Sequence, residues 1–103
     1  MVRVTKSAVA KRLADVPQEK RFWCQDGRAL KSLSDLEIAL RDMSDGVFHH
    51  HVSETNNDFS NWVRDVVGDM KLSSDLRKSR TQLQVAKSIA DRIAWLKSKI
   101  ATG

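Results

Sequence analysis

The stretch "SLSDLEIALRDM", residues 32–43, decides the fold class of this chain of 103 residues. Its apolar residues recur three and four positions apart, the spacing that places side chains on one face of an α-helix; they are Leu33, Leu36, Leu40 and Met43. Ser34 and Glu37 have the spacing of a capping box, in which two side chains satisfy backbone N–H groups at a helix start. The stretch therefore predicts an amphipathic helix that begins at Ser34.

Four more helices are predicted after this one. Their spans, with the expected capping residues, are 46–53 after Ser44 or Asp45, 58–68 after Asn56 or Asn57, 69–79, and 81–100. Gly68 is expected to end the second of them, because glycine readily takes the left-handed conformation at a helix C-terminus. The apolar stripes of these helices contain Val47, Phe48, His51 and Val52; Phe59, Trp62, Val63 and Val66; Met70, Leu72 and Leu76; and Ala86, Ile89, Ile93, Leu96 and Ile100.

The N-terminal third predicts a helix followed by a β-hairpin. The helix is expected over residues 7–14, and Pro17 ends the helical stretch because the residue before a proline is disfavoured in the helical region. In "RFWCQDGRAL", residues 21–30, the Asp26-Gly27 pair is typical of a two-residue type I′ turn between short strands. Residues 1–5 are expected to form a flexible tail.

These patterns predict a mainly α fold. We expect a single helical domain over residues 1–103, in which a compact bundle of about five short helices packs with an N-terminal helix and a short β-hairpin. Apolar residues at 41% and charged residues at 30% are ordinary for a soluble protein, and no run of about 18 apolar residues suits a membrane span. The N-terminus lacks the apolar run of a secretory signal, and the only cysteine is Cys24. Both features favour the cytoplasm.

Charge is distributed unevenly along the chain. Residues 1–34 hold eight Lys and Arg against three Asp and Glu (+5), residues 35–70 hold two against eight (−6), and residues 71–103 hold eight against two (+6). The acidic middle and the basic ends either attract one another within the fold, mostly as weak surface pairs, or the basic ends converge into a patch for an acidic partner such as nucleic acid. We favour the first interpretation, because no block of five Lys or Arg residues is present.

An aromatic-rich strand, a glycine turn and a leucine-rich helix are followed by a set of residues with a specific pattern: Phe48, His51, Val52, Asn57, Asp58, Phe59, Trp62 and Val63. On these features, the region of about residues 21–80 resembles a small uncharacterised family of archaeal and bacterial domains. This resemblance implies an all-α fold. It implies no activity, because the family has none assigned.

Three consecutive histidines raise the question of a metal site. Consecutive side chains on a helix diverge by about 100°, so His49, His50 and His51 do not converge on one ion. His50 and Glu54 are four apart but supply only two ligands, so we expect no metal. His51 is instead expected to be partly buried and hydrogen-bonded to a backbone carbonyl or to a carboxylate such as Asp58.

No catalytic motif accompanies these residues. Cys24 with His51 and Asp58 is the one combination that resembles a nucleophile with its base, but no glycine motif or oxyanion arrangement supports it. The four glycines are isolated, so no phosphate-binding loop is present and no cofactor is implied. We expect a protein that is not an enzyme.

The tryptophans point to a candidate interaction surface. Trp62 and Trp23 are expected in the core, whereas Trp95 lies on the opposite helical face from Ile93 and Ile100. Trp95 is covered by the N-terminal helix through Ala8, Val9 and Leu13, or it is exposed to a protein partner or a stacked base. The expected surface comprises Trp95, Arg92 and Lys99, with a cluster of Arg77, Lys78 and Arg80 beside it.

The sequence therefore predicts a non-catalytic protein-interaction or regulatory module. Its expected partner is an unidentified protein or a second copy of the chain, with no membrane involved. The alternative is a protein that binds nucleic acid or a ribonucleoprotein through its basic N- and C-terminal segments. A helix-turn-helix motif that reads DNA bases is not favoured, because the candidate recognition helix does not begin with a run of polar residues that could contact bases.

Overall fold

A computed structural model describes residues 5–79 and 81–101 of the chain and confirms the predicted mainly α fold with a short β-hairpin. Six α-helices, a 3₁₀ turn, a π-helical turn and a two-stranded antiparallel sheet make up the described part. In chain order the elements are α1 (Lys6–Leu13), η1 (Gln18–Lys20), β1 (Phe22–Trp23), β2 (Ala29–Leu30), α2 (Leu33–Asp42), α3 (Asp45–His51), α4 (Asp58–Trp62), η2 (Val63–Val67), α5 (Met70–Lys78) and α6 (Gln82–Ala101).

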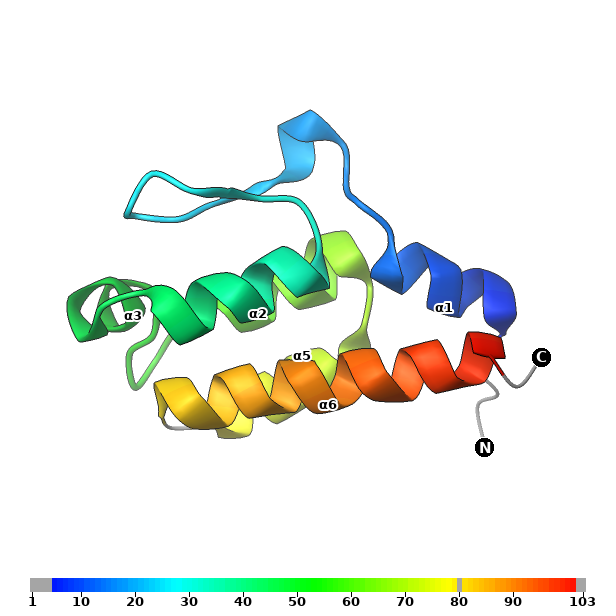
Figure 1. Ribbon diagram of the computed structural model, residues 1–103. Coiled ribbons are helices and arrows are strands. Elements are labelled where there is room, and N and C mark those ends of the chain that lie inside the picture. Colours follow the sequence, from blue (N-terminus) through cyan, green and yellow to red (C-terminus); the bar gives the residue numbers. More distant parts are fainter. Residues whose placement is uncertain (1–4, 80, 102–103) are drawn as a thin grey trace.

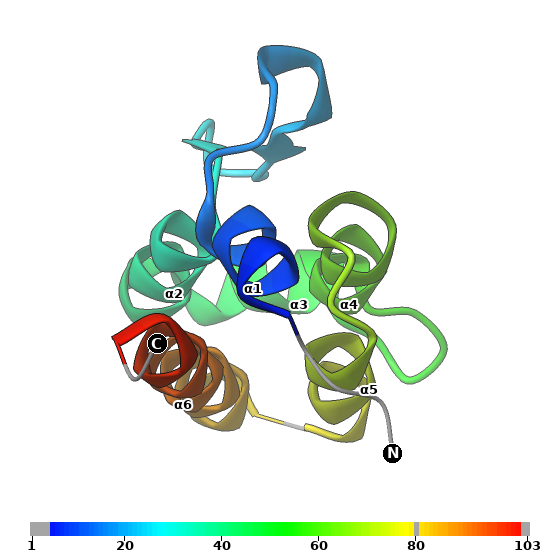
Figure 2. The same cartoon turned by 90° about the vertical axis from the view of Figure 1, so that its right-hand side faces the viewer.

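Four of the six described α-helices form two pairs, α2 with α6 and α4 with α5, and the hairpin lies above them (Figure 1). Helix α2 lies along α6, and the two run in opposite directions (Figure 1). Viewed from the end, α2 and α6 lie on one side, α4 and α5 lie on the other, and the hairpin covers the top (Figure 2). Helix α1 packs against α6 near the end at which α6 finishes. The N-terminal and C-terminal helices therefore meet at one end of the molecule.

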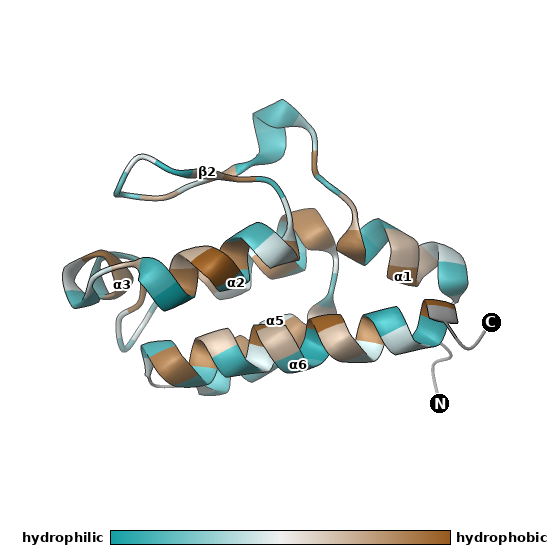
Figure 3. Ribbon diagram, viewed as in Figure 1, coloured by the Kyte–Doolittle hydropathy of each residue, from teal (hydrophilic) through white to brown (hydrophobic). Residues whose placement is uncertain are grey.

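A single apolar cluster fills the space between these elements. Apolar and polar segments alternate along α2 and α6 (Figure 3), as expected for helices that bury one face. The largest side chains that are fully buried are Phe48, Phe59, Leu33, Leu36, Leu40, Leu72, Leu76, Ile89, Leu96, Val9, Val63 and Val85. The residues of the five predicted stripes are thus in the core or packed against it, except Met70, which is 60% exposed, and Ile100, which is 44% exposed. These two residues lie near helix ends, beyond the packed centre.

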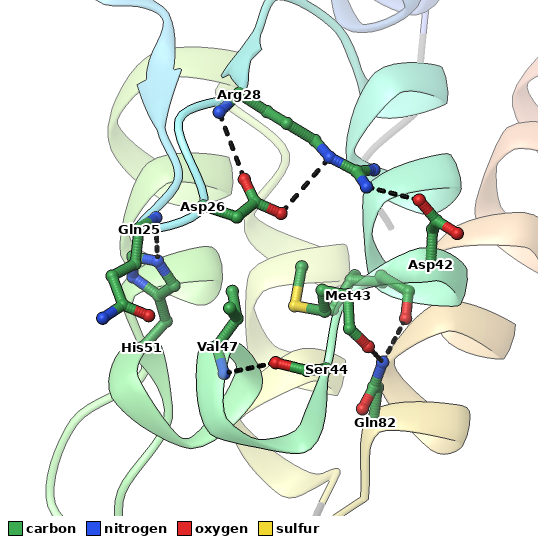
Figure 4. Close-up of polar contacts among 10 residues, drawn as sticks. Gln25, Asp26, Arg28, Asp42, Met43, Ser44, Val47, His51 and Gln82 are labelled. Atoms are coloured by element: carbon green, nitrogen blue, oxygen red, sulfur yellow. Dashed lines mark hydrogen bonds and ion pairs between the residues drawn. The ribbon is translucent and has the colours of Figure 1, made fainter.

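Helix α2 begins earlier than the capping-box spacing predicts. Its N-cap is Ser32, whose Oγ accepts a hydrogen bond from the Asp35 backbone N–H (3.2 Å). Ser34 is exposed inside the first turn. At the other end, Gln82 of α6 donates from Nε2 to the carbonyls of Leu40 and Met43 (Figure 4). This amide satisfies two carbonyls at the end of α2 and fixes how α2 lies against α6.

The hairpin has a longer loop than the predicted two-residue turn. Phe22 pairs with Leu30, and the Cys24 backbone N–H donates to the Arg28 carbonyl (2.9 Å). Three residues, 25–27, therefore form the loop. Only Gly27 among them has a positive φ, +96°, whereas a type I′ turn needs positive φ at both central residues. The Asp26 carboxylate accepts from the Arg28 backbone N–H instead (3.1 Å), which favours this longer loop.

Polar side chains begin the remaining helices where the sequence predicts. Ser44 caps α3 and Asn57 caps α4, in each case by accepting a backbone hydrogen bond three residues ahead. Gly68 ends η2 in the left-handed conformation, with φ +82°. Ser60 of α4 and Ser73 of α5 are buried, and each hydroxyl contacts the carbonyl of the other residue (2.8 and 2.9 Å). These small side chains let α4 and α5 approach closely.

Helix α1 begins at Lys6 and ends at Leu13, one residue earlier at each end than predicted. Thr5, which the sequence assigned to the flexible tail, is its N-cap and accepts from the Ala8 backbone N–H (3.1 Å). The rest of the expected tail, residues 1–4, lies outside the described residues. Of the helices that the structure describes, none combines the length and the apolar character needed to cross a lipid bilayer.

Candidate functional site

His51 joins the hairpin to the helices. It lies at the end of α3, is 6% exposed, and has Nδ1 3.0 Å from Oδ2 of Asp58. Its Nε2 accepts a hydrogen bond from the Gln25 backbone N–H in the hairpin loop (3.0 Å; Figure 4). The ring also packs against Phe22 and Phe59, with centroid distances of 5.0 and 5.2 Å. The structure confirms the prediction of a hydrogen-bonded His51, and of the two predicted kinds of partner it has the carboxylate of Asp58; the ring is more fully buried than predicted.

These contacts define the chemistry of His51. An N–H group donates to Nε2, so Nδ1 carries the ring proton and donates it to Asp58. The Nε2 lone pair, which a general base would use, is already engaged. Cys24, the residue before Gln25, is 5% exposed, and burial raises the pKa of its thiol. Because the thiolate is the nucleophilic form, this arrangement suits a structural junction better than a nucleophile with its base.

The other two histidines lie outside the contacts that bury His51, apart from one edge contact of the His50 ring. His49 is exposed, and its Nδ1 lies 2.8 Å from the Asp45 carbonyl oxygen one turn earlier. His50 is exposed and meets the His51 ring only edge to face. Within residues 5–79 and 81–101, no three His, Cys, Asp or Glu side chains are grouped so that they could hold a metal ion.

Trp95 on α6 lies between two cations. The guanidinium carbon of Arg92 is 4.4 Å from the indole centroid, and Nζ of Lys99 is 5.0 Å from it. Both distances are in the range of cation–π contacts. Trp95 keeps 38% of its surface exposed, although α1 packs on the same helix and buries Val9 completely. The structure therefore brings together the first three predicted surface residues and leaves the indole partly open.

Arg92 is fixed by a buried aspartate. Its Nε and Nη2 donate to the two carboxylate oxygens of Asp69, at 2.7 and 3.0 Å. The Asp69 side chain is fully buried, and the Arg92 side chain is only 12% exposed. Asp69 also caps α5 by accepting from the Leu72 backbone N–H. Arg92 thus positions Trp95 and is not a free surface cation.

The second predicted cluster lies at the other end of α6. Arg77 and Lys78 are exposed at the end of α5, just before α6 begins, whereas Lys99 is near the end of that helix. A helix of 20 residues is about 30 Å long, so the two clusters are not adjacent. Arg77 and Lys78 also line different hollows. Arg80, the third member, lies outside the described residues.

The remaining tryptophans differ in burial. Trp62 is 7% exposed and donates from Nε1 to the Lys20 carbonyl (2.8 Å), which confirms its predicted place in the core. Trp23 is 65% exposed, so the prediction that it packs into the core was wrong. Successive residues of a strand point to opposite faces, and in β1 it is Phe22 that faces inward.

The acidic middle segment and the two basic end segments form few ion pairs with one another. Among the described residues, two ion pairs join the acidic middle to a basic end, Arg28 with Asp42 and Arg92 with Asp69. The Asp42 carboxylate raises the pKa of Arg28 further. At the end where α1 meets α6, by contrast, several cations form no ion pair with any described residue: Lys6, Lys11, Arg12, Lys97 and Lys99. We call this region the basic end.

A polar pocket at the opposite end was not anticipated from the sequence. It has a volume of about 720 Å³ and lies between the segment of residues 53–57 and the end of α5. Charged and polar side chains on its lining include His49, Glu54, Asn61 and Arg77. The polar run "SETNN" is a signal for a loop, but only the tertiary fold brings Arg77 beside it.

Comparison of the chain with protein-family models, with curated proteins and with solved structures finds no match. The resemblance to a small family of archaeal and bacterial domains therefore stays a prediction. What the chain does is argued below from its own residues.

Proposed function

We propose that the protein is a non-catalytic interaction module that binds an acidic protein partner through Trp95 and the basic end. The observation that carries this proposal is the state of Trp95, which is open to solvent yet held between two cations. Tryptophan is enriched among the residues that dominate binding energy at protein interfaces. A large aromatic side chain that is already fixed loses little conformational entropy on binding.

Charge supports the same proposal. Lys97 and Lys99 lie beside Trp95 in sequence and form no ion pair with any described residue. Protein interfaces commonly have an apolar anchor at the centre and charged residues at the rim. Here Trp95 would be the anchor, and an acidic partner would supply counter-charges for the lysines around it. The expected partner therefore has an acidic surface with an apolar recess for an indole ring.

The test is capture of the partner from the cells that make the protein, using tagged wild type and two variants. Trp95→Ala is expected to lose the partner, with affinity lower by about 30-fold or more, because truncating such an anchor costs about 2 kcal/mol. Trp23→Ala is the matched control, since Trp23 is more exposed and lies on the hairpin. Circular dichroism checks that both variants fold. Equal capture by Trp95→Ala and wild type would contradict the proposal.

A second candidate function is nucleic-acid binding, and the meeting of α1 with α6 favours it. This contact brings cations from the two basic segments to one end of the molecule, where Trp95 offers a surface for a stacked base. Helix α1 contains no acidic residue, and α6 has none after Asp91. Such a patch suits phosphate contacts that do not depend on sequence.

Salt dependence separates this function from the first. Binding of generic RNA or DNA is expected to weaken steeply as salt rises, and Lys97→Gln and Lys99→Gln are each expected to lower the slope of log K against log salt by about one. Lys71→Gln is a control, because Lys71 pairs with Asp75 away from the basic end. Absence of binding at low salt would exclude nucleic acid and leave the acidic protein.

We further propose that the module acts in the cytoplasm. Support comes from Cys24, which is the only cysteine, is free and is buried. A reducing compartment suits a chain without an internal disulfide. Detection of the tagged protein in fractionated cells tests this location, and recovery from a secreted fraction would contradict it.

A further inference from the structure

The polar pocket holds two opposite charges that do not pair. Arg77 comes from the end of α5 and Glu54 from the segment after α3, and both line the cavity. Neither side chain has an ion pair or a hydrogen bond with any residue in the described part of the chain. A cation and an anion on the walls of one cavity provide sites for two opposite charges of a ligand.

Two apolar side chains also line the pocket. Phe48, which is 1% exposed, and Val52, which is partly buried, both line it. A volume of about 720 Å³ is also large enough for a small molecule, since ligand sites commonly measure about 300–1,000 Å³. An apolar group of a ligand can therefore contact Val52 and the small part of Phe48 that is not buried.

The wall beside Glu54 is held in place by a chain of hydrogen bonds. Asn61 donates to Oδ1 of Asn56 (3.1 Å), and Asn56 donates to Oδ1 of Asp58 (2.7 Å). Asp58 accepts from His51, which in turn accepts from the Gln25 backbone N–H. The loop is thus tied to the hairpin, and a cavity with a fixed wall binds without a large cost for ordering. No described residue donates to Oδ1 of Asn61, which leaves an acceptor on the wall.

We propose that this pocket binds a small zwitterionic ligand, an α-amino acid with an apolar side chain. The ligand carboxylate binds the Arg77 guanidinium, for which a planar anion with two oxygens is the matching partner. The ligand ammonium binds Glu54 and donates to Asn61. The apolar side chain covers Phe48 and Val52. A ligand with only one charge would leave Arg77 or Glu54 without a charged partner.

The pocket is separate from the surface of the proposed function. It lies near the start of α6, whereas Trp95 and Lys99 are in the second half of that 20-residue helix. Changes at one site should therefore leave binding at the other intact, so that either proposal can fail alone.

The first test is titration of the isotopically labelled full-length protein, followed by amide NMR shifts. Free leucine, methionine and phenylalanine are compared with N-acetyl-leucine, which lacks the ammonium, and with leucinamide, which lacks the carboxylate. The free amino acids are expected to shift amides of residues 48–61 and 77–79. Each blocked form is expected to bind about tenfold more weakly or worse, since a hydrogen bond to a charged group is lost.

Two variants then assign the charges. Arg77→Gln and Glu54→Gln should each weaken leucine binding by about tenfold. Glu54→Gln should leave the residual binding of N-acetyl-leucine unchanged, because this ligand has no ammonium to bind Glu54. Arg77→Gln should likewise leave the binding of leucinamide unchanged, because leucinamide has no carboxylate to bind Arg77. Lys78→Gln is the matched control, since Lys78 is adjacent in α5 but does not line this pocket. Arg77 and Lys78 are both exposed, so Arg77→Gln and Lys78→Gln are expected to fold.

Three outcomes would overturn the proposal. The first is the absence of amide shifts with any of the free amino acids at millimolar concentration. The second is equal affinity for leucine and its N-acetyl form, with loss of both in Arg77→Gln, which would define an anion pocket. The third is an equal effect of Lys78→Gln and Arg77→Gln, which would indicate a general response to surface charge.

Discussion

Two aspartates near helix starts, Asp69 and Asp58, each bind a basic side chain of another helix, but they do so in different environments. Asp69 caps α5 and holds Arg92 of α6, and both side chains are almost fully removed from water. Asp58 lies in the first turn of α4 and holds His51 of α3, yet 39% of the Asp58 side chain is exposed. The first junction joins two ions, whereas the second joins a carboxylate to a neutral ring.

This difference determines how much stability the protein loses when one partner of each junction is removed. A buried ion has lost its hydration, so removing one partner leaves a desolvated charge with nothing to offset it. A neutral imidazole beside a partly hydrated carboxylate can exchange one hydrogen bond for a bond to water at a smaller cost. The Asp69 junction is therefore expected to be the more sensitive one, and the His51 junction the more tolerant one.

The largest effect is expected for Asp69→Asn. The amide keeps an oxygen for the Leu72 N–H but cannot neutralise Arg92, so we expect a loss of about 3–5 kcal/mol in the free energy of unfolding. Urea denaturation followed by circular dichroism measures it. The control is Asp75→Asn, which breaks the exposed pair with Lys71 on the same helix and should cost about 0.5 kcal/mol or less. Similar losses for the two variants would show that burial does not distinguish these pairs.

Substitution of His51 separates its two hydrogen bonds. Gln places an amide near the position of Nε2, where its oxygen can accept from Gln25, whereas Asn places an amide near Nδ1 and keeps only the bond to Asp58. Both lose the ring contacts, and we expect losses of about 1–3 kcal/mol, larger for His51→Asn because it leaves a partly buried N–H without an acceptor. Denaturant titration of both variants gives the order. The reverse order would mean that Asp58 is the more important partner.

The same two junctions show what the sequence can and cannot reveal. His51 and Asp58 are seven residues apart in adjacent helices, so helical periodicity and capping signals bring them together before any tertiary contact is known. Asp69 and Arg92 are 23 residues apart on helices that meet only after folding. From the sequence Arg92 resembled an exposed cation, because the residues around it do not show which face of α6 will be covered by α5.

Other differences have the same origin. The period of three and four residues predicts the helices, since it records which face each buries, but Ser32 and Ser34 both stand at the start of α2 and only the backbone decides between them. A strand of two residues is too short for a period to show which side faces the core, so Trp23 was assigned wrongly. The polar pocket combines residues 53–57 with Arg77, which are distant in sequence. It therefore could not be predicted from either segment alone.

The smallest effect concerns Cys24, next to the tolerant junction. Burial raises the pKa of its thiol above the ordinary value of 9.0, so the folded state favours the protonated form. The unfolded chain ionises first as pH rises, which lowers the stability of the fold. The contribution of Cys24 is therefore complete below about pH 9 and is lost as pH rises through the higher pKa of the folded state. Urea denaturation at several pH values between 8 and 10 measures this dependence, and Cys24→Ala is expected to show a shallower decline than wild type.

The comparison of pH slopes isolates the thiol because the lysines titrate alike in both proteins, and the small cavity left by alanine lowers stability equally at every pH. Parallel declines would mean that the thiol ionises as readily in the folded state as in the unfolded chain, and hence that water reaches the hairpin edge of the junction. In that case the Gln25 N–H beside it could also be hydrated, and the difference expected between His51→Asn and His51→Gln should shrink. The pH slope and the order of the two His51 variants thus test the same property, the exclusion of water from this junction.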